Sequence, residues 1–160
     1  MARFLIVLIA VCAVFPALAE RYSGPRPPKP DIPYLLHANK LLSTEVAQAH
    51  EERGKKDATT YVIDGAASAA KTPVPEPIFI MQSDNVQAER LGLYRLDARN
   101  GHREVVIGQK RGRNSPRQLF LNVTRLGDGL YRIESSQILE PGEYSLSPEG
   151  SNQVFCFSVY

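Results

Sequence analysis

The chain has 160 residues, 43% of them hydrophobic, and a formal net charge of +2. This length suits one domain that buries a packed core without covalent cross-links. A charge so close to neutral excludes any argument from overall charge for a nucleic-acid or membrane partner.

Residues 1–19 have the three parts of a secretory signal peptide. Arg3 supplies a positive charge, Phe4 to Leu18 is uncharged and largely apolar, and an A-x-A pattern ends at Ala19. The apolar run is shorter than the ~20 residues that span a bilayer, so we expect no transmembrane segment in the mature chain. We expect cleavage after Ala19 and a periplasmic or extracellular protein. The alternative, lipidation at Cys12, lacks the small residue that should precede the cysteine.

Residues 20–33 are rich in proline, with five prolines between Gly24 and Pro33. Proline fixes φ and lacks an amide donor, which excludes a helix or an interior strand. We expect an extended spacer, with a ligand for a proline-binding groove as the alternative. Residues 34–160 are expected to form a single β-sandwich domain.

From Tyr34 onward the pattern predicts short strands joined by turns. The expected strands are 34–38, 58–64, 78–81, 91–96, 102–107, 119–124, 130–134, 143–146 and 154–160. Residues 40–50 are ambiguous between a strand and a weak amphipathic helix, and a hairpin between 41–50 and 58–64 is favoured. The run 78–81 is apolar throughout, which indicates a central strand buried on both faces.

Turn residues divide these strands at regular intervals. Asn100-Gly101 is the strongest hairpin signal, because both residues tolerate a positive φ. Three prolines between residues 73 and 77 exclude regular structure there. Together the pattern predicts an all-β, antiparallel two-sheet sandwich, immunoglobulin-like, of about seven to nine strands with little helix.

The stretch from Leu139 to Tyr144 resembles the tyrosine corner of immunoglobulin-like and fibronectin-type sandwiches. There a tyrosine hydroxyl reaches back to a backbone group in the turn between two strands and links the sheets. The resemblance implies that Pro141, Gly142 and Tyr144 are structural residues. The chain has no tryptophan, and only one cysteine follows residue 19, so the resemblance concerns the architecture and not membership of the superfamily.

The same ending, Pro141 to Tyr144 followed by Phe155-Cys156-Phe157, resembles that of a group of uncharacterised exported bacterial proteins. This resemblance implies a bacterial envelope setting and carries no activity and no site residues. Cys156 lies in an apolar strand pattern, where a free cysteine behaves as a small apolar residue, so we expect it to be buried.

The sequence contains no catalytic or metal-binding motif with the local structure and spacing that its chemistry requires. Ser68 to Lys71 and Ser83 to Asn85 match two motifs of penicillin-recognising serine enzymes. The prolines at 73 and 75 exclude the helix that this chemistry needs, which indicates coincidence. The histidines stand at positions 37, 50 and 102, without ligand spacing. We therefore expect no catalytic residues, no metal and no cofactor.

One charge cluster is basic, with Glu104 as its only acid. We select as candidate binding residues for an anionic partner Arg103, Lys110, Arg111, Arg113 and Arg117. The partner is expected to be an anionic glycan, a lipid headgroup or another envelope protein. Nucleic acid is not expected, because no aromatic platform stands among the charges. A solvated loop that keeps a sheet edge from pairing is the favoured interpretation of this cluster, and anion binding is its alternative.

The sequence as a whole favours an exported, non-enzymatic module that binds or assembles with another envelope component. One alternative is a small hydrolase whose residues come from scattered loops, which predicts a concave pocket with convergent titratable side chains. Another is a structural subunit that pairs through a sheet edge, which predicts a long unprotected edge strand. A binding module predicts a flat basic or apolar patch.

Overall fold

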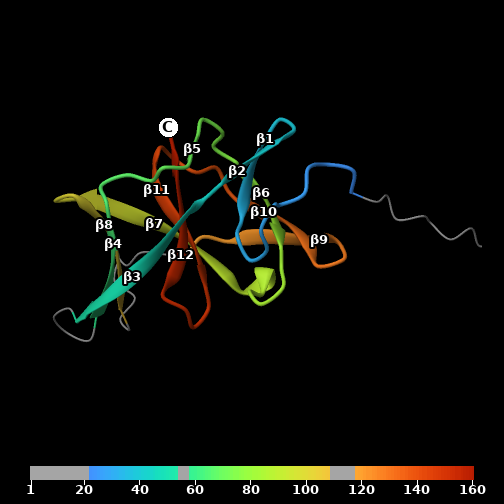
Figure 1. Cartoon of the computed structure of the whole chain (residues 1–160). Helices are drawn as coiled ribbons and strands as arrows, with labels where there is room; N and C mark the ends of the chain where they lie inside the picture. The colour runs from blue at the N-terminus through green and yellow to red at the C-terminus, as the bar shows by residue number, and fades with distance from the viewer. Residues whose placement is uncertain (1–21, 54–57, 109–117) are drawn as a thin grey trace, which may run out of the picture.

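The computed structural model describes residues 22–53, 58–108 and 118–160 (Figure 1). Within these residues lie twelve strands and one short 3-10 helix, η1 (Ala88–Arg90). The strands are β1 (Tyr34–His37), β2 (Lys40–Ser43), β3 (Glu45–Arg53), β4 (Ala58–Asp64), β5 (Lys71–Thr72), β6 (Ile78–Gln82), β7 (Leu91–Arg99), β8 (His102–Gly108), β9 (Leu121–Gly127), β10 (Leu130–Ser135), β11 (Gly142–Pro148) and β12 (Gln153–Val159). The prediction of an all-β chain with little helix is confirmed, with more strands than the seven to nine expected.

The strands form two sheets, as predicted, but the larger sheet closes on itself. Its order is β11-β7-β8-β4-β3-β12-β5, and β11 also pairs with β12. This last pairing joins six strands into a barrel, while β5 adds to β12 in parallel. An immunoglobulin-like sandwich has two open sheets, so that finer prediction is not confirmed.

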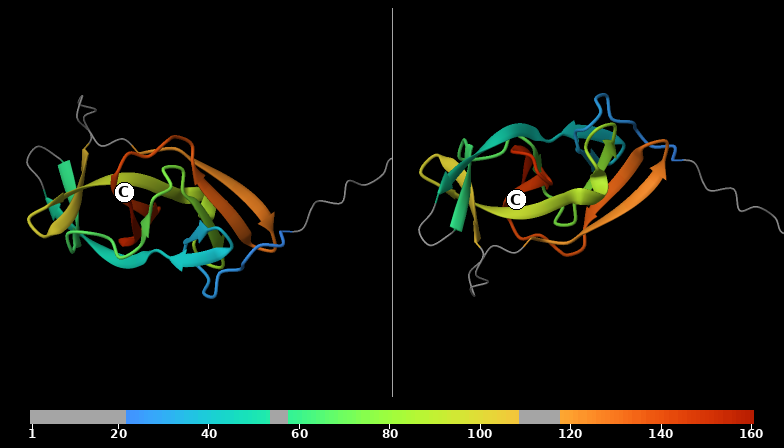
Figure 2. Two further views of the ribbon diagram at one scale, coloured as in Figure 1. Left: turned by 90° about the horizontal axis from the view of Figure 1, so that it is seen from above. Right: turned by 90° about the horizontal axis from the view of Figure 1, so that it is seen from below.

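The smaller sheet has the order β2-β1-β6-β10-β9, so β6 is its central strand. Phe79, Ile80 and Met81 on β6 are almost completely buried, which confirms the prediction for this apolar run. In Figure 2, β9 and β10 lie at the opposite end of the molecule from β4 and β8. The strands β2 and β9 are the two edges of this sheet.

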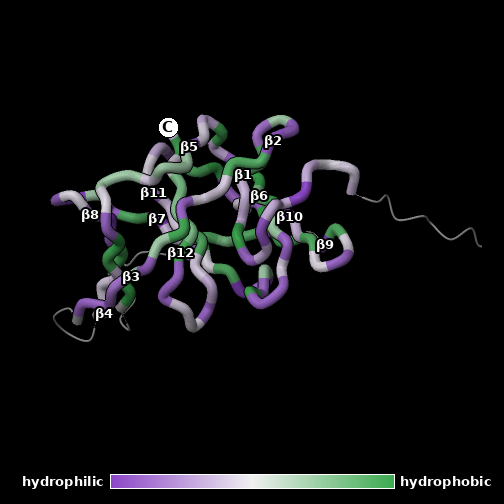
Figure 3. The backbone as a smooth tube through the Cα atoms, in the orientation of Figure 1, coloured by the Kyte–Doolittle hydropathy of each residue, from purple (hydrophilic) through white to green (hydrophobic). Residues whose placement is uncertain are grey.

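The hairpins follow from turn residues that adopt a left-handed backbone. Asn100 and Gly101 have φ values of 54° and 82° and connect β7 to β8, as predicted. Asp128 and Gly129 make the same kind of two-residue turn between β9 and β10, with φ values of 47° and 71°. The ambiguous segment 40–50 is strand throughout most of its length, and β3 pairs antiparallel with β4. Figure 3 shows the β1–β2 and β7–β8 hairpin ends as hydrophilic.

The first apolar core lies between the barrel and the smaller sheet. Leu146, Phe155 and Phe157 on the barrel pack against β6 and β10. At the edge of this core the Tyr144 hydroxyl donates a 2.7 Å hydrogen bond to the backbone carbonyl of Glu140. That bond spans the connection from β10 in one sheet to β11 in the other, as the tyrosine-corner resemblance implies.

A second interior lies inside the barrel, because side chains alternate between the two faces of each strand. Val154 and Cys156 on β12 point into the barrel, and Ile63 on β4 packs with them. Cys156 is free and buried, as predicted. β12 is therefore buried on both faces, which explains its continuous apolar sequence.

The last residues of the predicted proline-rich spacer belong to the folded body. The Asp31 carboxylate accepts 2.9 Å hydrogen bonds from the backbone N–H groups of Asp84, Asn85 and Val86. The Pro33 carbonyl accepts bonds from Thr44. Residues 31–33 are thus fixed to the loop after β6 and to Thr44 between β2 and β3, before β1 begins.

Asp31→Asn is expected to lower the free energy of unfolding by about 1 kcal/mol at neutral pH, because it removes the charge that strengthens three backbone hydrogen bonds to the loop after β6. Burial raises the pKa of Asp31, but the hydrogen bonds from Val86, Asn85 and Asp84 outweigh it and hold the pKa below its usual range. A depressed carboxyl pKa contributes stability above the usual range, and this contribution is lost as the pH falls through the folded value. Urea unfolding at neutral pH and at about pH 3 should therefore show a difference that shrinks on acidification.

The matched control is Asp84→Asn, because that carboxylate accepts no hydrogen bond from the described residues. A loss of equal size in this control would contradict the role given to Asp31.

Candidate ligand cavity

The two ends of the barrel interior differ in chemistry. Strand periodicity places Glu143, Ser145 and Ser147 of β11 on the inner face, while Tyr144 faces the smaller sheet. Charged residues gather at the end near Glu143. At the other end, beyond Ser145, the interior is hollow.

The closed end is built around Arg103, whose side chain has no exposed surface. Its Nη2 donates 2.7 Å bonds to Glu45 Oε1 and to the Asp64 carbonyl. Its Nε donates to the Gly65 carbonyl at 2.8 Å, and Nη1 donates to Ser68 Oγ at 2.8 Å. The guanidinium is therefore fully engaged within the protein.

Glu143 completes this arrangement, and we call Arg103, Glu45, Glu143 and Ser68 the Arg103 cluster. The Glu143 Oε2 atom accepts bonds from the Ser68 backbone N–H at 2.9 Å and from its hydroxyl at 2.5 Å, and it lies 3.9 Å from Arg103 Nη1. Burial alone would lower the pKa of Arg103, but the hydrogen bond and charge of Glu45 outweigh it and raise the pKa. The cation is thus neutralised where water is excluded.

The loop after β4 seals this end of the barrel. Ser68 is bonded to β11 through Glu143, and the Ala69 N–H donates to Glu45 Oε2 on β3 at 2.8 Å. Gly65 begins the loop with a φ of 89°, in the region that favours glycine. Lys71 then enters strand β5, so no helix carries Ser68 and Lys71 together.

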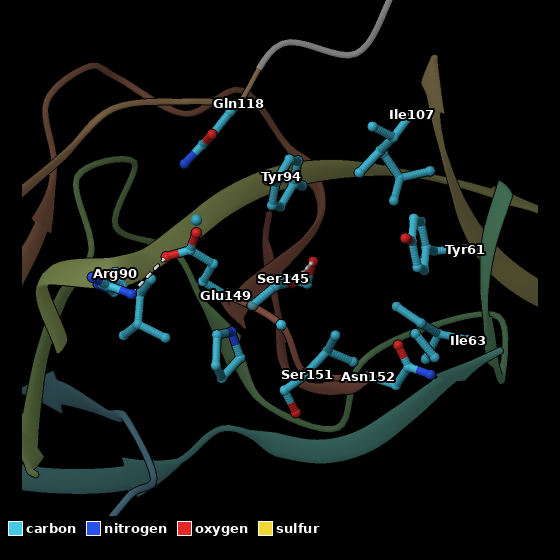
Figure 4. A pocket seen from close by; sticks show the side chains of 18 of the residues that line it. Tyr61, Ile63, Arg90, Tyr94, Ile107, Gln118, Ser145, Glu149, Ser151 and Asn152 are labelled. Atoms are coloured by element: carbon cyan, nitrogen blue, oxygen red, sulfur yellow. Dashed lines mark hydrogen bonds and ion pairs between the residues drawn. The ribbon is translucent and has the colours of Figure 1, made fainter. Parts of the chain in front are cut away.

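The open end holds a cavity of about 730 Å³ (Figure 4). Its deep wall is apolar and buried, and consists of Ala49, Ile63, Val105 and Val154. Tyr61 on β4 and Tyr94 on β7 project from different walls, as Figure 4 shows. Polar residues form the rim, namely Glu51, Glu89, Arg90, Gln118, Ser147, Glu149, Ser151 and Asn152.

Gly92 makes room for one of these tyrosines. A Cβ atom at this position would lie 2.7 Å from Tyr94 Cε2 and 3.1 Å from Gln118 Nε2. The Tyr94 ring therefore lies back over β7, two residues along the same inner face. Any larger residue at position 92 would push the ring toward the hollow part of the barrel.

Ser145 is the buried polar group of the cavity wall, with 1% of its surface exposed. Its Oγ atom lies 3.3 Å from Ser147 Oγ, a long contact for two hydroxyl groups. Among the described residues no other side-chain partner of Ser145 is present. The hydroxyl therefore retains hydrogen-bonding capacity toward the cavity.

Two phenols and one thiol inside the barrel have a raised pKa and hold their protons at neutral pH. Burial raises the pKa of Tyr94, and burial together with the neighbouring Glu51 raises the pKa of Tyr61. Burial also raises the pKa of Cys156 to about 12, although Arg103 opposes the shift. At the rim, Arg90 Nη1 lies 3.4 Å from Glu149 Oε2 in an exposed ion pair.

The predicted site residues that the structure describes, Arg103, Pro141, Gly142 and Tyr144, do not line this cavity. Arg103 is buried and its guanidinium is occupied, so it is not part of an exposed basic surface. Lys110, Arg111, Arg113 and Arg117 lie outside the described residues. Pro141 and Gly142 precede and begin β11, and Tyr144 makes the bond to Glu140.

The cavity itself was missed by the sequence analysis. Val62 stands between Tyr61 and Ile63, and Val106 stands between Val105 and Ile107, so apolar residues point to both faces of these strands. No signal in that pattern separates a barrel interior from the face between two sheets.

Other site types find no support within residues 22–53, 58–108 and 118–160. No group of three or more His, Cys, Asp or Glu residues is placed there to hold a metal ion. No helix there is long and apolar enough to cross a membrane. Comparisons with protein-family models, with curated proteins and with solved structures found no match.

Proposed function

We propose that this protein is an exported, non-enzymatic binding module that holds a small, partly apolar molecule in the open end of its barrel. The cavity of about 730 Å³ carries the proposal, since small-molecule sites occupy about 300–1,000 Å³ and combine apolar walls with a few polar groups. The Arg103 cluster closes the opposite end, so the interior is a pocket with one entrance. The site proposed here is concave, whereas a flat patch was expected for a binding module.

The chemistry of the cavity favours binding over catalysis. A general acid or base works best with a pKa near the working pH, whereas the pKa values of Tyr61, Tyr94 and Cys156 are all raised. Ser145 has no base beside it among the described residues. Arg90 and Glu149 neutralise each other at the rim. A scattered-loop hydrolase therefore has less support than a binding protein.

Export through the segment 1–19 and contact with an envelope partner remain part of the proposal. The likeness of the C-terminal strands to exported bacterial proteins supports this setting. Assembly through a sheet edge stays a prediction, and β9 is the longer of the two edge strands of the smaller sheet.

Ile107→Trp is expected to weaken binding of N-phenyl-1-naphthylamine by at least ~10-fold, because the added ring fills the entrance. Ile107 lines the cavity and is 41% exposed, so a larger side chain does not overpack the core. The dye is neutral and fluoresces in apolar surroundings, so a fluorescence titration of the purified chain measures its affinity. The wild-type chain has no tryptophan that would interfere.

The matched control is Val106→Trp, one residue earlier on β8. Val106 is 40% exposed and points to the outer face of the barrel. Saturable dye binding that survives in both variants, or that is lost equally in both, would refute the cavity as the binding site.

A further inference from the structure

We infer that the cavity selects an uncharged ligand that carries one hydrogen-bonding group, which binds to the Ser145 hydroxyl while a ring or short chain packs on the apolar wall. This inference rests on the proposed function. It adds the class of ligand and its orientation, and its ligand would be a flat alcohol, phenol or ketone.

The first argument for an uncharged ligand is that the deep part of the described cavity offers no charged side chain to pair with an ion. The deep wall is made of Ala49, Ile63, Val105 and Val154, all at least nine-tenths buried. Moving an ion into such surroundings without a counter-ion costs far more than moving a neutral polar group. A ligand that enters fully must therefore leave its charge behind or have none.

The charged groups nearest this wall are already satisfied or stand at the rim. In the Arg103 cluster, the guanidinium and hydrogen bonds from Ser68 and from the Ala69 N–H hold the carboxylates of Glu45 and Glu143 at the closed end. Arg90 and Glu149 pair with each other in solvent. Glu51 is exposed and stands beside Tyr61. None of these groups offers a desolvated counter-ion to a ligand in the deep part.

The second argument concerns Ser145, whose buried hydroxyl makes only one long hydrogen-bond contact among the described side chains. Its contact with Ser147 Oγ at 3.3 Å leaves at least one lone pair of the Ser145 hydroxyl for a ligand. Figure 4 draws Ser145 near the centre of the view, with Tyr94 on one side and Ser151 and Asn152 on the other. A polar atom of the ligand is thus fixed at β11.

The two tyrosines give the third step. Tyr61 and Tyr94 present aromatic surface from β4 and β7 with phenols that stay protonated at neutral pH. Flat rings pack well against such surfaces in offset or edge arrangements. Gly92 keeps the Tyr94 ring against its own strand, which leaves the space between the walls available.

A matched series of probes tests the inference on the full chain. We would displace N-phenyl-1-naphthylamine with naphthalene, 2-naphthol, 2-naphthoate and 2-naphthylmethylammonium, which share one ring system. 2-Naphthol is expected to bind best, and the anion and the cation at least ~10-fold more weakly. Binding of either ion as tightly as the phenol overturns the selection for neutral ligands. Failure of the whole series to displace the bound dye overturns the proposed ligand class.

Ser145→Ala tests the anchor. It should weaken 2-naphthol about fivefold and leave naphthalene unchanged, because one neutral hydrogen bond is lost. Ser43→Ala, at an exposed position on β2 outside the cavity lining, is the control and should change neither affinity by more than about twofold. An equal loss for naphthalene and 2-naphthol in Ser145→Ala would indicate only a damaged wall and would overturn the role of Ser145. Dye binding that fails in the wild type contradicts the proposed function itself, so the two failures are distinguishable.

Discussion

Arg103→Met is expected to lower the free energy of unfolding by about 3–5 kcal/mol, the range typical when one partner of a buried ion pair is removed. The loss has two parts. Glu45 and Glu143 would keep their charges near the closed barrel end without a cation, and Ser68 with two loop carbonyls would lose donors. Urea denaturation at neutral pH measures the change.

The matched control is Arg99→Met, which removes an arginine from the neighbouring hairpin. Arg99 forms ion pairs with Asp97 and Glu104, but its own side chain is 58% exposed. Exposed pairs contribute about 0–1 kcal/mol, so this variant should unfold almost like the wild type. Equal losses in the two variants would contradict the distinct role of the Arg103 cluster.

A second set of variants separates the effect of losing the Arg103 cation from the effect of leaving the carboxylates of Glu45 and Glu143 without a counter-ion. Adding Glu45→Gln and Glu143→Gln to Arg103→Met is expected to recover part of the stability, since no buried charge is then left uncompensated. A further loss in the triple variant would instead mean that the carboxylates contribute mainly through their bonds to the sealing loop.

Phe157→Ala is expected to cost about 3–5 kcal/mol of unfolding free energy, as large truncations in a packed core do. The Phe157 ring lies 4.9 Å from that of Phe79 at an interplanar angle of 66°. It also stacks on Tyr144 at 5.5 Å and 19°. One residue of β12 therefore joins the barrel to β6 of the smaller sheet.

Phe120→Ala makes the same substitution at a side chain that is 76% exposed, and it should change stability by no more than about 0.5 kcal/mol. Thermal or urea unfolding of the pair provides the comparison. A cost for Phe157→Ala below about 1 kcal/mol would show that the two sheets are held together elsewhere.

Local features of the fold were predictable because their causes are local. Asn100-Gly101 forms its hairpin because two adjacent residues accept a positive φ. The apolar run of β6 forms a central strand because it has no polar face that could be exposed to solvent. The Tyr144 bond to Glu140 spans only four residues.

Barrel closure was not predictable, because it depends on pairing between strands far apart in the sequence. Residues 153–156 pair with residues 45–48, and nothing in the sequence of either segment indicates this pairing. Alternation of apolar residues looks the same on a barrel wall and on a sandwich face. Arg103 stands in a basic stretch, so only its contact with Glu45, 58 residues away, identifies it as an interior residue.

The double burial of β12 has a consequence for the order of folding. Its two faces complete the barrel interior and the layer between the sheets, so neither can be finished while residues 153–159 are missing. Strands that pair before β12 is in place would therefore expose apolar faces to solvent.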